Sequence, residues 1–271
     1  MIISHKYRFV FVGLPFSASS AISKELNLMY DGKARLSKHS LYQDFLKDAE
    51  ADELNYFVFA VLRNPMEIVV TGYEKMKANA KGNFTNPQLF TENGGHITKK
   101  HRQRFQYIHQ QGASFQQYFT RYFKQPYDNL ASLTIDNCDY VIRYENIEND
   151  YIEALKKAGI KNPRPLPVAN KTVGKKTEIL SYYSDEIKDQ AIYIFGPFFK
   201  KYKYQFPETW GKNIQPSVKS MIHFKALSFL RKLNYKYFKN KSEKVGLKDT
   251  IYGDIQRQAK SNTKTHFDKS K

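Results

Sequence analysis

FVFVGLPFSASSAISKEL, at residues 9–26, is the stretch that decides the fold. Its aromatic and β-branched start predicts a short strand over residues 7–12, and its later part predicts a helix over residues 21–30. Between them, small and hydroxyl side chains at a helix start leave backbone N–H groups and serine hydroxyls able to surround an anion. The spaced glycines and the final GK[ST] of a Walker A loop are absent. The pattern therefore fits either a phosphate-type site or an ordinary β-to-α turn capped by serine.

A second strand-to-helix unit follows at residues 56–73, which read YFVFAVLRNPMEIVVTGY. The uninterrupted apolar run at 56–62 predicts a strand buried on both faces, and Pro65 suits the first turn of the next helix. Arg63 stands directly after the strand, where its planar guanidinium could bind phosphate oxygens or lie in a solvated turn. With a further short strand predicted at 34–38, three strand-to-helix units predict an α/β fold with a mostly parallel central sheet.

The middle of the chain continues the α/β pattern. We expect a helix at 114–123, a strand at 139–143, and helices at 149–158 and 184–202. Residues 78–112 are polar and weakly periodic, which predicts a long loop that serves as a lid or an acceptor cleft.

Charge divides the chain. The net charge is +18, and residues 212–271 carry 15 Lys/Arg against 4 Asp/Glu, or +11. We expect an α/β domain over 1–210, a basic amphipathic helix over 211–240 and a polar tail over 241–271. The helix could dock on the domain, lie on an anionic membrane or bind an acidic glycan or nucleic acid. We favour docking on the domain together with peripheral contact to an anionic membrane through residues 212–240. We do not expect binding to nucleic acid, because only the net charge suggests it.

The sequence argues against several other classes of protein. No run of eighteen apolar residues occurs, and the first residues lead into a strand and not into a signal peptide. We therefore expect no membrane span and a cytoplasmic location, with any peripheral contact at the inner membrane surface. The single cysteine, Cys138, cannot form an internal disulfide, which suits a reducing compartment and excludes a cysteine-based metal cluster.

Two segments resemble the sulfotransferases that use 3′-phosphoadenosine 5′-phosphosulfate, especially the carbohydrate-type and related bacterial branch. GLPFSASSAI at 13–22 is similar to the family's 5′-phosphosulfate turn. RNPMEIVVTGY at 63–73 is similar to its 3′-phosphate motif, R-D-P-x-x-R-x-x-S-x-Y, with Arg63 and Tyr73 matched and Thr71 in the serine's place. The likeness covers most of Phe9–Pro207. It includes further similar segments at 139–151, 166–172 and 182–207.

The resemblance implies a P-loop-like three-layer fold and transfer of a sulfuryl group from this donor to a hydroxyl. The branch resembled points to a carbohydrate acceptor, and no metal is implied. The residues implied at the donor site are Pro15, Ser17, Ala18, Ser19, Ser20, Arg63, Thr71 and, in a basic loop, Lys175.

The catalytic base implied by the resemblance is His39, because many members carry a histidine after the second strand in a Lys-His context. An imidazole titrates near neutrality and can take the acceptor's proton, although a surface histidine at a helix start is the alternative. Glu25, Glu74 and His96 are weaker candidates for the base.

One position departs from the family pattern. The usual Lys or Arg after the proline of the first turn is Phe16 here. Lys24 in the following helix or Lys38 beside His39 could supply the missing cation, and we favour Lys38. Otherwise the chain is a non-catalytic nucleotide- or polyanion-binding protein on the same fold. A kinase-like phosphotransferase is disfavoured, because GK[ST] and an acidic Mg²⁺-binding strand end are absent.

Overall fold

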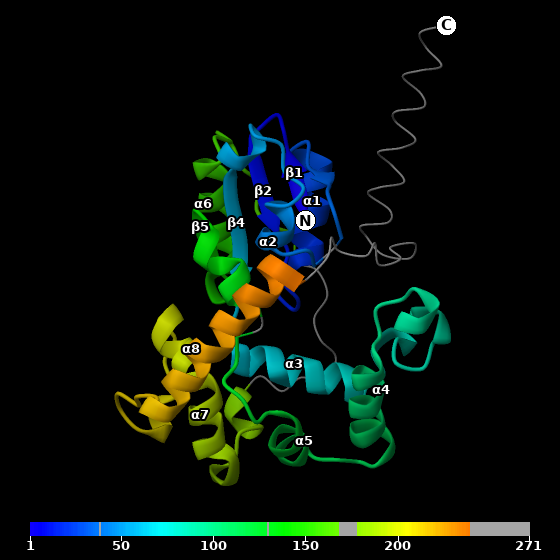
Figure 1. Cartoon of the computed structure of the whole chain (residues 1–271), viewed down its shortest axis with the longest axis vertical. Coiled ribbons are helices and arrows are strands. Elements are labelled where there is room, and N and C mark those ends of the chain that lie inside the picture. The colour runs from blue at the N-terminus through cyan, green and yellow to red at the C-terminus, as the bar shows by residue number, and fades with distance from the viewer. Residues whose placement is uncertain (38, 129, 168–177, 239–271) are drawn as a thin grey trace, which may run out of the picture. The chain divides into compact units, whose positions relative to one another are not determined.

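The computed structural model describes residues 1–37, 39–128, 130–167 and 178–238. The chain divides into two compact units, each assembled from separate segments, whose colours follow the sequence in Figure 1. The sheet unit comprises Met1–Arg63, Leu130–Asn170 and Tyr235–Lys271, and the helical unit comprises Asn64–Asn129 and Lys171–Asn234. The two units are defined by which residues pack together, and not by which segments fold independently. The domain boundaries expected from the sequence therefore stay a prediction.

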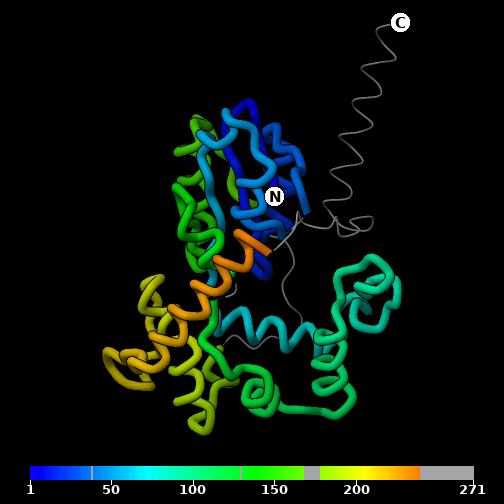
Figure 2. The backbone as a smooth tube through the Cα atoms, in the orientation of Figure 1, coloured from blue at the N-terminus to red at the C-terminus, as the bar shows by residue number. Residues whose placement is uncertain are grey.

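The sheet unit is built on five strands in the order β3-β1-β2-β4-β5. β2 (Phe9–Val12), β4 (Phe57–Leu62) and β5 (Tyr140–Arg143) are parallel neighbours, and their backbones can be followed side by side in Figure 2. β1 (Ile2–Ser4) pairs antiparallel with β2, and β3 (Lys33–Ala34) pairs antiparallel with β1. The prediction of an α/β fold is confirmed, but the sheet is mixed and its parallel part is confined to β2, β4 and β5.

The strand-to-helix unit predicted to begin at residue 34 differs from its expectation. The strand expected at 34–38 is the two-residue β3 beside β1, and the helix that follows is the single turn α2 (Tyr42–Phe45). β1 was not predicted, because three residues are too few to show the period of two that identifies a strand. Since β1 and β2 are adjacent in the chain and joined by a short turn, they pair antiparallel.

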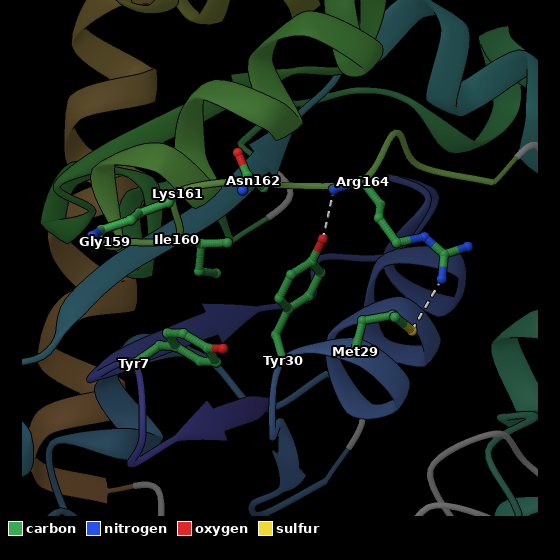
Figure 3. A pocket seen from close by; sticks show the side chains of 8 residues that line it. All are labelled: Tyr7, Met29, Tyr30, Gly159, Ile160, Lys161, Asn162 and Arg164. Atoms are coloured by element: carbon green, nitrogen blue, oxygen red, sulfur yellow. Dashed lines mark hydrogen bonds between the residues drawn. The ribbon is translucent and has the colours of Figure 1, made fainter.

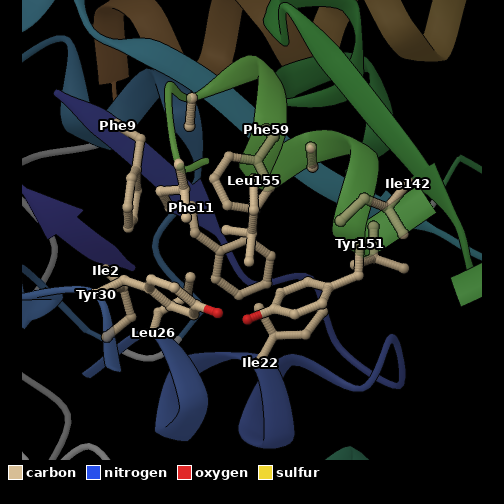
Figure 4. Close-up of a cluster of buried hydrophobic side chains, with 14 residues drawn as sticks. Ile2, Phe9, Phe11, Ile22, Leu26, Tyr30, Phe59, Ile142, Tyr151 and Leu155 are labelled. Carbon is tan, nitrogen blue, oxygen red and sulfur yellow. The ribbon is translucent and has the colours of Figure 1, made fainter. Parts of the chain in front are cut away.

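The core of the sheet unit lies between one face of the sheet and the helices α1 (Ser19–Met29) and α6 (Ile147–Lys157). Side chains alternate along a strand, so Phe9 and Phe11 share the face that packs against both helices (Figure 4). Val10 and Val12 on the opposite face are also buried. The predicted burial on both faces is confirmed for β4, where all residues after Phe57 are buried.

The helical unit contains no strand among its described residues. Its described α-helices are α3 (Pro65–Lys77), α4 (Lys99–Phe105), α5 (Phe115–Tyr122), α7 (Asp185–Tyr202) and α8 (Val218–Leu233). Aromatic rings fill its core: Phe119 lies 5.7 Å from Phe195 and 5.5 Å from Tyr183, measured between ring centroids. The predicted helices at 114–123 and 184–202 are confirmed as α5 and α7.

The prediction of a long loop at 78–112 is wrong. This segment contains α4, a π-helical turn at Gln106–Gln110 and three short 3₁₀ turns. Thr98 begins α4 with a capping box, its hydroxyl accepting the N–H of His101 at 3.2 Å. The helix escapes a pattern search because its sequence, KKHRQRF, places only Phe105 in the buried core.

The basic segment predicted to be helical contains α8, which packs on α7. The tail expected at 241–271 lies outside the described residues, and so does the basic loop at 170–176. None of the described helices is long and apolar enough to cross a membrane.

Candidate anion-binding site

The turn after β2 has a strained backbone. Phe16 and Ala18 both adopt left-handed conformations, with φ of 62° and 54°, at a cost of about 1–2 kcal/mol each for residues with a Cβ. The Ser17 hydroxyl donates to the Leu14 carbonyl at 2.6 Å and closes the turn. Left-handed residues in a turn can direct successive N–H groups into one anion-binding concavity.

The start of α1 adds donors to this turn. The Ala18 carbonyl accepts the first helical bonds, from the N–H groups of Ala21 and Ile22 at 2.9 and 3.2 Å, so the N–H groups of Ser19 and Ser20 precede the helical ladder. No side chain caps this end, and the positive end of the helix dipole favours an anion there. Of the predicted serines, Ser17 is committed to Leu14, Ser19 is buried and Ser20 is partly exposed.

Arg63 joins the turn from the neighbouring strand. Because β2 and β4 are parallel, their carboxyl ends meet at one edge of the sheet, and Arg63 follows β4 directly. Its Nη1 donates to the Phe16 carbonyl at 2.9 Å, and its guanidinium carbon lies 4.1 Å from the centroid of the Tyr144 ring. Arg63 is only 8% exposed. The guanidinium therefore holds the strained turn in place and brings a positive charge to it.

His39 reaches the same turn. Its Nδ1 lies 2.8 Å from the carbonyl oxygen of Gly13, the residue that follows β2. Since a carbonyl oxygen only accepts, Nδ1 carries the proton of this bond, and in the neutral ring Nε2 is the basic nitrogen. The ring is exposed. The structure thus brings His39, Arg63 and the serine turn to one edge of the sheet.

The remaining predicted site residues belong to the helical unit or lie outside the described residues. Thr71 is on α3 in the helical unit, is 3% exposed and has no hydrogen-bond partner for its hydroxyl among the described residues. Lys38 and Lys175 lie outside the described residues. Glu74, a weaker candidate for the base, is buried in the helical unit and accepts the Tyr182 hydroxyl at 2.9 Å.

Tyr144 is a member of the site that the sequence analysis missed. β4 and β5 are parallel, with Leu62 opposite Arg143, so the residues that follow them, Arg63 and Tyr144, are neighbours. The signal was available: an aromatic residue directly after the strand next to Arg63 can stack on its guanidinium.

A separate pocket of about 490 Å³ lies at the other edge of the sheet unit (Figure 3). It is formed where α1 and α6 end, and the Arg164 N–H donates to the Tyr30 hydroxyl across it at 2.7 Å. The guanidinium of Arg164, a lining residue, lies 3.8 Å from the buried Glu25 carboxylate. None of the residues implied at the donor site lines this pocket.

Among the described residues, no group of three or more His, Cys, Asp or Glu side chains is arranged to hold a metal ion. Comparisons of the chain with protein-family models, with curated proteins and with solved structures find no match in any of the three. What the geometry defines is a class: an α/β protein with a cationic, donor-rich turn at the carboxyl ends of its parallel strands, the edge at which open α/β sheets bind ligands.

Proposed function

We propose that the chain is a sulfotransferase that moves a sulfuryl group from 3′-phosphoadenosine 5′-phosphosulfate to a carbohydrate hydroxyl. The observation that carries the proposal is the Arg63–Phe16 hydrogen bond, at 2.9 Å. It joins two segments, each similar to one phosphate-binding motif of that family, at the edge of the sheet where anions are bound. The P-loop-like three-layer arrangement belongs to the same proposal.

The reaction assigns His39 as the base. His39 Nε2 takes the proton of the acceptor hydroxyl, the hydroxyl oxygen forms a bond to sulfur, and the bond from sulfur to the bridging phosphate oxygen breaks. The electron pair of that bond leaves on the 5′-phosphate of adenosine 3′,5′-bisphosphate. The contact between Nδ1 and the Gly13 carbonyl supports this role, because it leaves Nε2 as the basic nitrogen.

Charge on the leaving phosphate requires stabilisation, which Phe16 cannot provide. In the proposal, the N–H groups of Ser19 and Ser20, the Ser20 hydroxyl and the positive end of α1 face the 5′-phosphate. Lys38 supplies the cation that stands at position 16 in the family. Thr71, in the place of the family's serine, remains the predicted contact to the 3′-phosphate.

The first test is calorimetric titration of the full chain with adenosine 3′,5′-bisphosphate. We expect the wild type to bind with a micromolar or lower Kd. Arg63→Ala should lower the affinity at least tenfold, because a hydrogen bond to a charged group contributes about 1.5–3 kcal/mol. Arg164→Ala is the matched control: it removes an arginine of the same unit from the opposite edge of the sheet and should leave binding unchanged.

Arg63 also holds the turn, so its loss could act through folding. Ser20→Ala removes a partly exposed hydroxyl at the start of α1 without touching Arg63, and should weaken binding with no change in the thermal unfolding midpoint. A folded wild-type protein that does not bind the bisphosphate would overturn the donor site.

A specific observation favours a second candidate function, a nucleotide-binding protein without catalysis. Phe16 is 38% exposed where the family carries a cation. Transfer of labelled sulfate to a panel of carbohydrates separates the two candidates. If the enzyme is active, His39→Ala should lower turnover by about 10²–10⁴-fold and leave bisphosphate affinity unchanged. Binding without transfer by the wild type would favour the second candidate.

A further inference from the structure

One face of α8 holds the helix on its own unit. Ser220 and Phe224 are buried, and the Tyr193 hydroxyl lies 2.9 Å from His223 Nδ1. Nearer the end of the helix, Arg231 pairs with the buried carboxylate of Asp128. These contacts determine which side of α8 is occupied by the protein itself.

The opposite face of α8 is apolar and exposed. Of the eleven large hydrophobic side chains that are exposed in the described residues, six lie between Val218 and Phe238. Four of them are on α8 itself: Val218, Ile222, Phe229 and Leu230 are 75%, 63%, 62% and 59% exposed. Single exposed apolar residues are ordinary, but several of them on one helix mark a candidate interaction surface.

The charges around this group identify its partner. Lys219, Lys225 and Lys232 are exposed on α8 beside the apolar side chains. The sequence from Thr209 to Ser242 contains eight Lys/Arg and no Asp or Glu. Lysines can extend from an apolar contact toward phosphate groups, and each basic residue near an anionic leaflet contributes about 1 kcal/mol. An exposed helix side that carries apolar side chains with lysines beside them, in a segment without acidic residues, matches a bilayer that is apolar inside and anionic at its surface.

We propose that the exposed face of α8 lies on an anionic lipid bilayer, with Ile222, Phe229 and Leu230 in the boundary between headgroups and acyl chains and the three lysines among the lipid phosphates. The docked face of the helix stays on the helical unit, so the contact is peripheral. It is independent of the sulfotransferase proposal, because it needs no nucleotide and no acceptor.

Flotation of the full chain with vesicles tests the proposal. The chain should float with vesicles of phosphatidylcholine mixed with phosphatidylglycerol and should not float with phosphatidylcholine alone. Ile222→Ser and Phe229→Ser should each weaken the partition about tenfold, and Lys225→Glu and Lys232→Glu by about fivefold or more each. These residues are exposed, so circular dichroism and the unfolding midpoint should not change.

Two variants serve as matched controls on the sheet unit. Leu28, on α1, is 58% exposed, which is nearly the exposure of Leu230, and Lys156 is an exposed lysine of α6. Leu28→Ser and Lys156→Glu should float as the wild type does. The depth of insertion into the bilayer is measured separately, by tryptophan fluorescence. Brominated lipid should quench the fluorescence of the Phe229→Trp variant more than that of the Leu28→Trp variant. Both are compared with the signal of Trp210, the single tryptophan of the chain.

Four results would overturn the proposal. The first is a wild-type chain that does not float with anionic vesicles. The second is flotation of the α8 variants equal to that of the wild type, which would put the contact elsewhere in the basic C-terminal part. Loss of flotation on charge reversal but not in the serine variants would reduce the contact to adsorption by charge. A lipid-free dimer that Ile222→Ser turns into a monomer in sedimentation would make this face an interface between two copies of the chain.

Discussion

The sheet unit and the helical unit use their polar groups in opposite ways. In the sheet unit, Arg63, His39 and the serine turn are delivered to one edge by strands that end there. In the helical unit, aromatic hydroxyls are donated internally: Tyr73 to the Ala113 carbonyl and Tyr183 to the Met66 carbonyl, at 3.0 and 3.1 Å. A parallel sheet therefore brings polar side chains together at the edge where its strands end. In the aromatic helical core, the tyrosine hydroxyls instead donate to backbone carbonyls inside the core.

Left-handed residues occur in both units, and in the sheet unit two of them lie at the candidate site. Phe16 and Ala18 are left-handed in the turn of the sheet unit, and the Arg63 contact to the Phe16 carbonyl holds that turn. Strain that persists at a strand end, fixed by a cation, is consistent with a ligand site. The core of the helical unit is built from ring contacts, such as the 4.9 Å between the centroids of Phe115 and Tyr183.

The largest effect would come from breaking the aromatic core. Phe119 is fully buried and lies 5.2 Å from the Phe123 ring centroid. Phe119→Ala should lower the free energy of unfolding by about 3–5 kcal/mol, through lost burial and a cavity. Amide hydrogen exchange should accelerate in α5 and α7 and not in β2 or β4.

The matched control for this change is Phe229→Ala, since Phe229 is 62% exposed and should alter stability by no more than about 0.5 kcal/mol. Equal acceleration of exchange in the strands of the Phe119→Ala variant would mean that the two units share one cooperative core, and the contrast between them would fail.

A smaller effect is expected from the ion pair that holds α8. Arg231 bonds the carboxylate of Asp128, whose side chain is 1% exposed. Arg231→Met would remove the positive charge that pairs with this buried carboxylate and should cost about 3 kcal/mol, with faster exchange in α8. Adding Asp128→Asn should recover part of the loss, because the charge itself is gone. Double-variant denaturation that shows simple additivity would contradict a direct pair.

The smallest effect is a pH dependence of α4. His101 Nδ1 accepts the Thr98 N–H at 3.3 Å, and burial, with the positive charges of Arg104 and His96, lowers the pKa of His101. The unfolded chain then binds more protons than the native one in this range, so stability should fall as pH drops below the ordinary histidine pKa of about 6.5. In urea denaturation, His101→Gln should remove this slope. An unchanged slope would assign the dependence to another group.

Much of the fold follows from local sequence. The apolar run at 57–62 marks a doubly buried strand, Pro65 with the Asn64 cap marks the start of α3, and the strand-to-helix order indicates α/β. β1 and β3 could not be predicted, because two or three residues carry no period and their pairing depends on distant partners. α4 was missed because a single buried residue gives no periodic face.

The candidate site divides in the same way. The sequence by itself determined that a serine-rich turn follows one strand, that Arg63 follows another, and that His39 and a basic, apolar helix are present, because residue type and spacing are local properties. Only the tertiary structure decided that Arg63 bonds the Phe16 carbonyl and stacks on Tyr144, that His39 faces Gly13, and which side of α8 is exposed. Strand order and helix packing depend on the burial of residues far apart in the chain, and no local pattern contains that information.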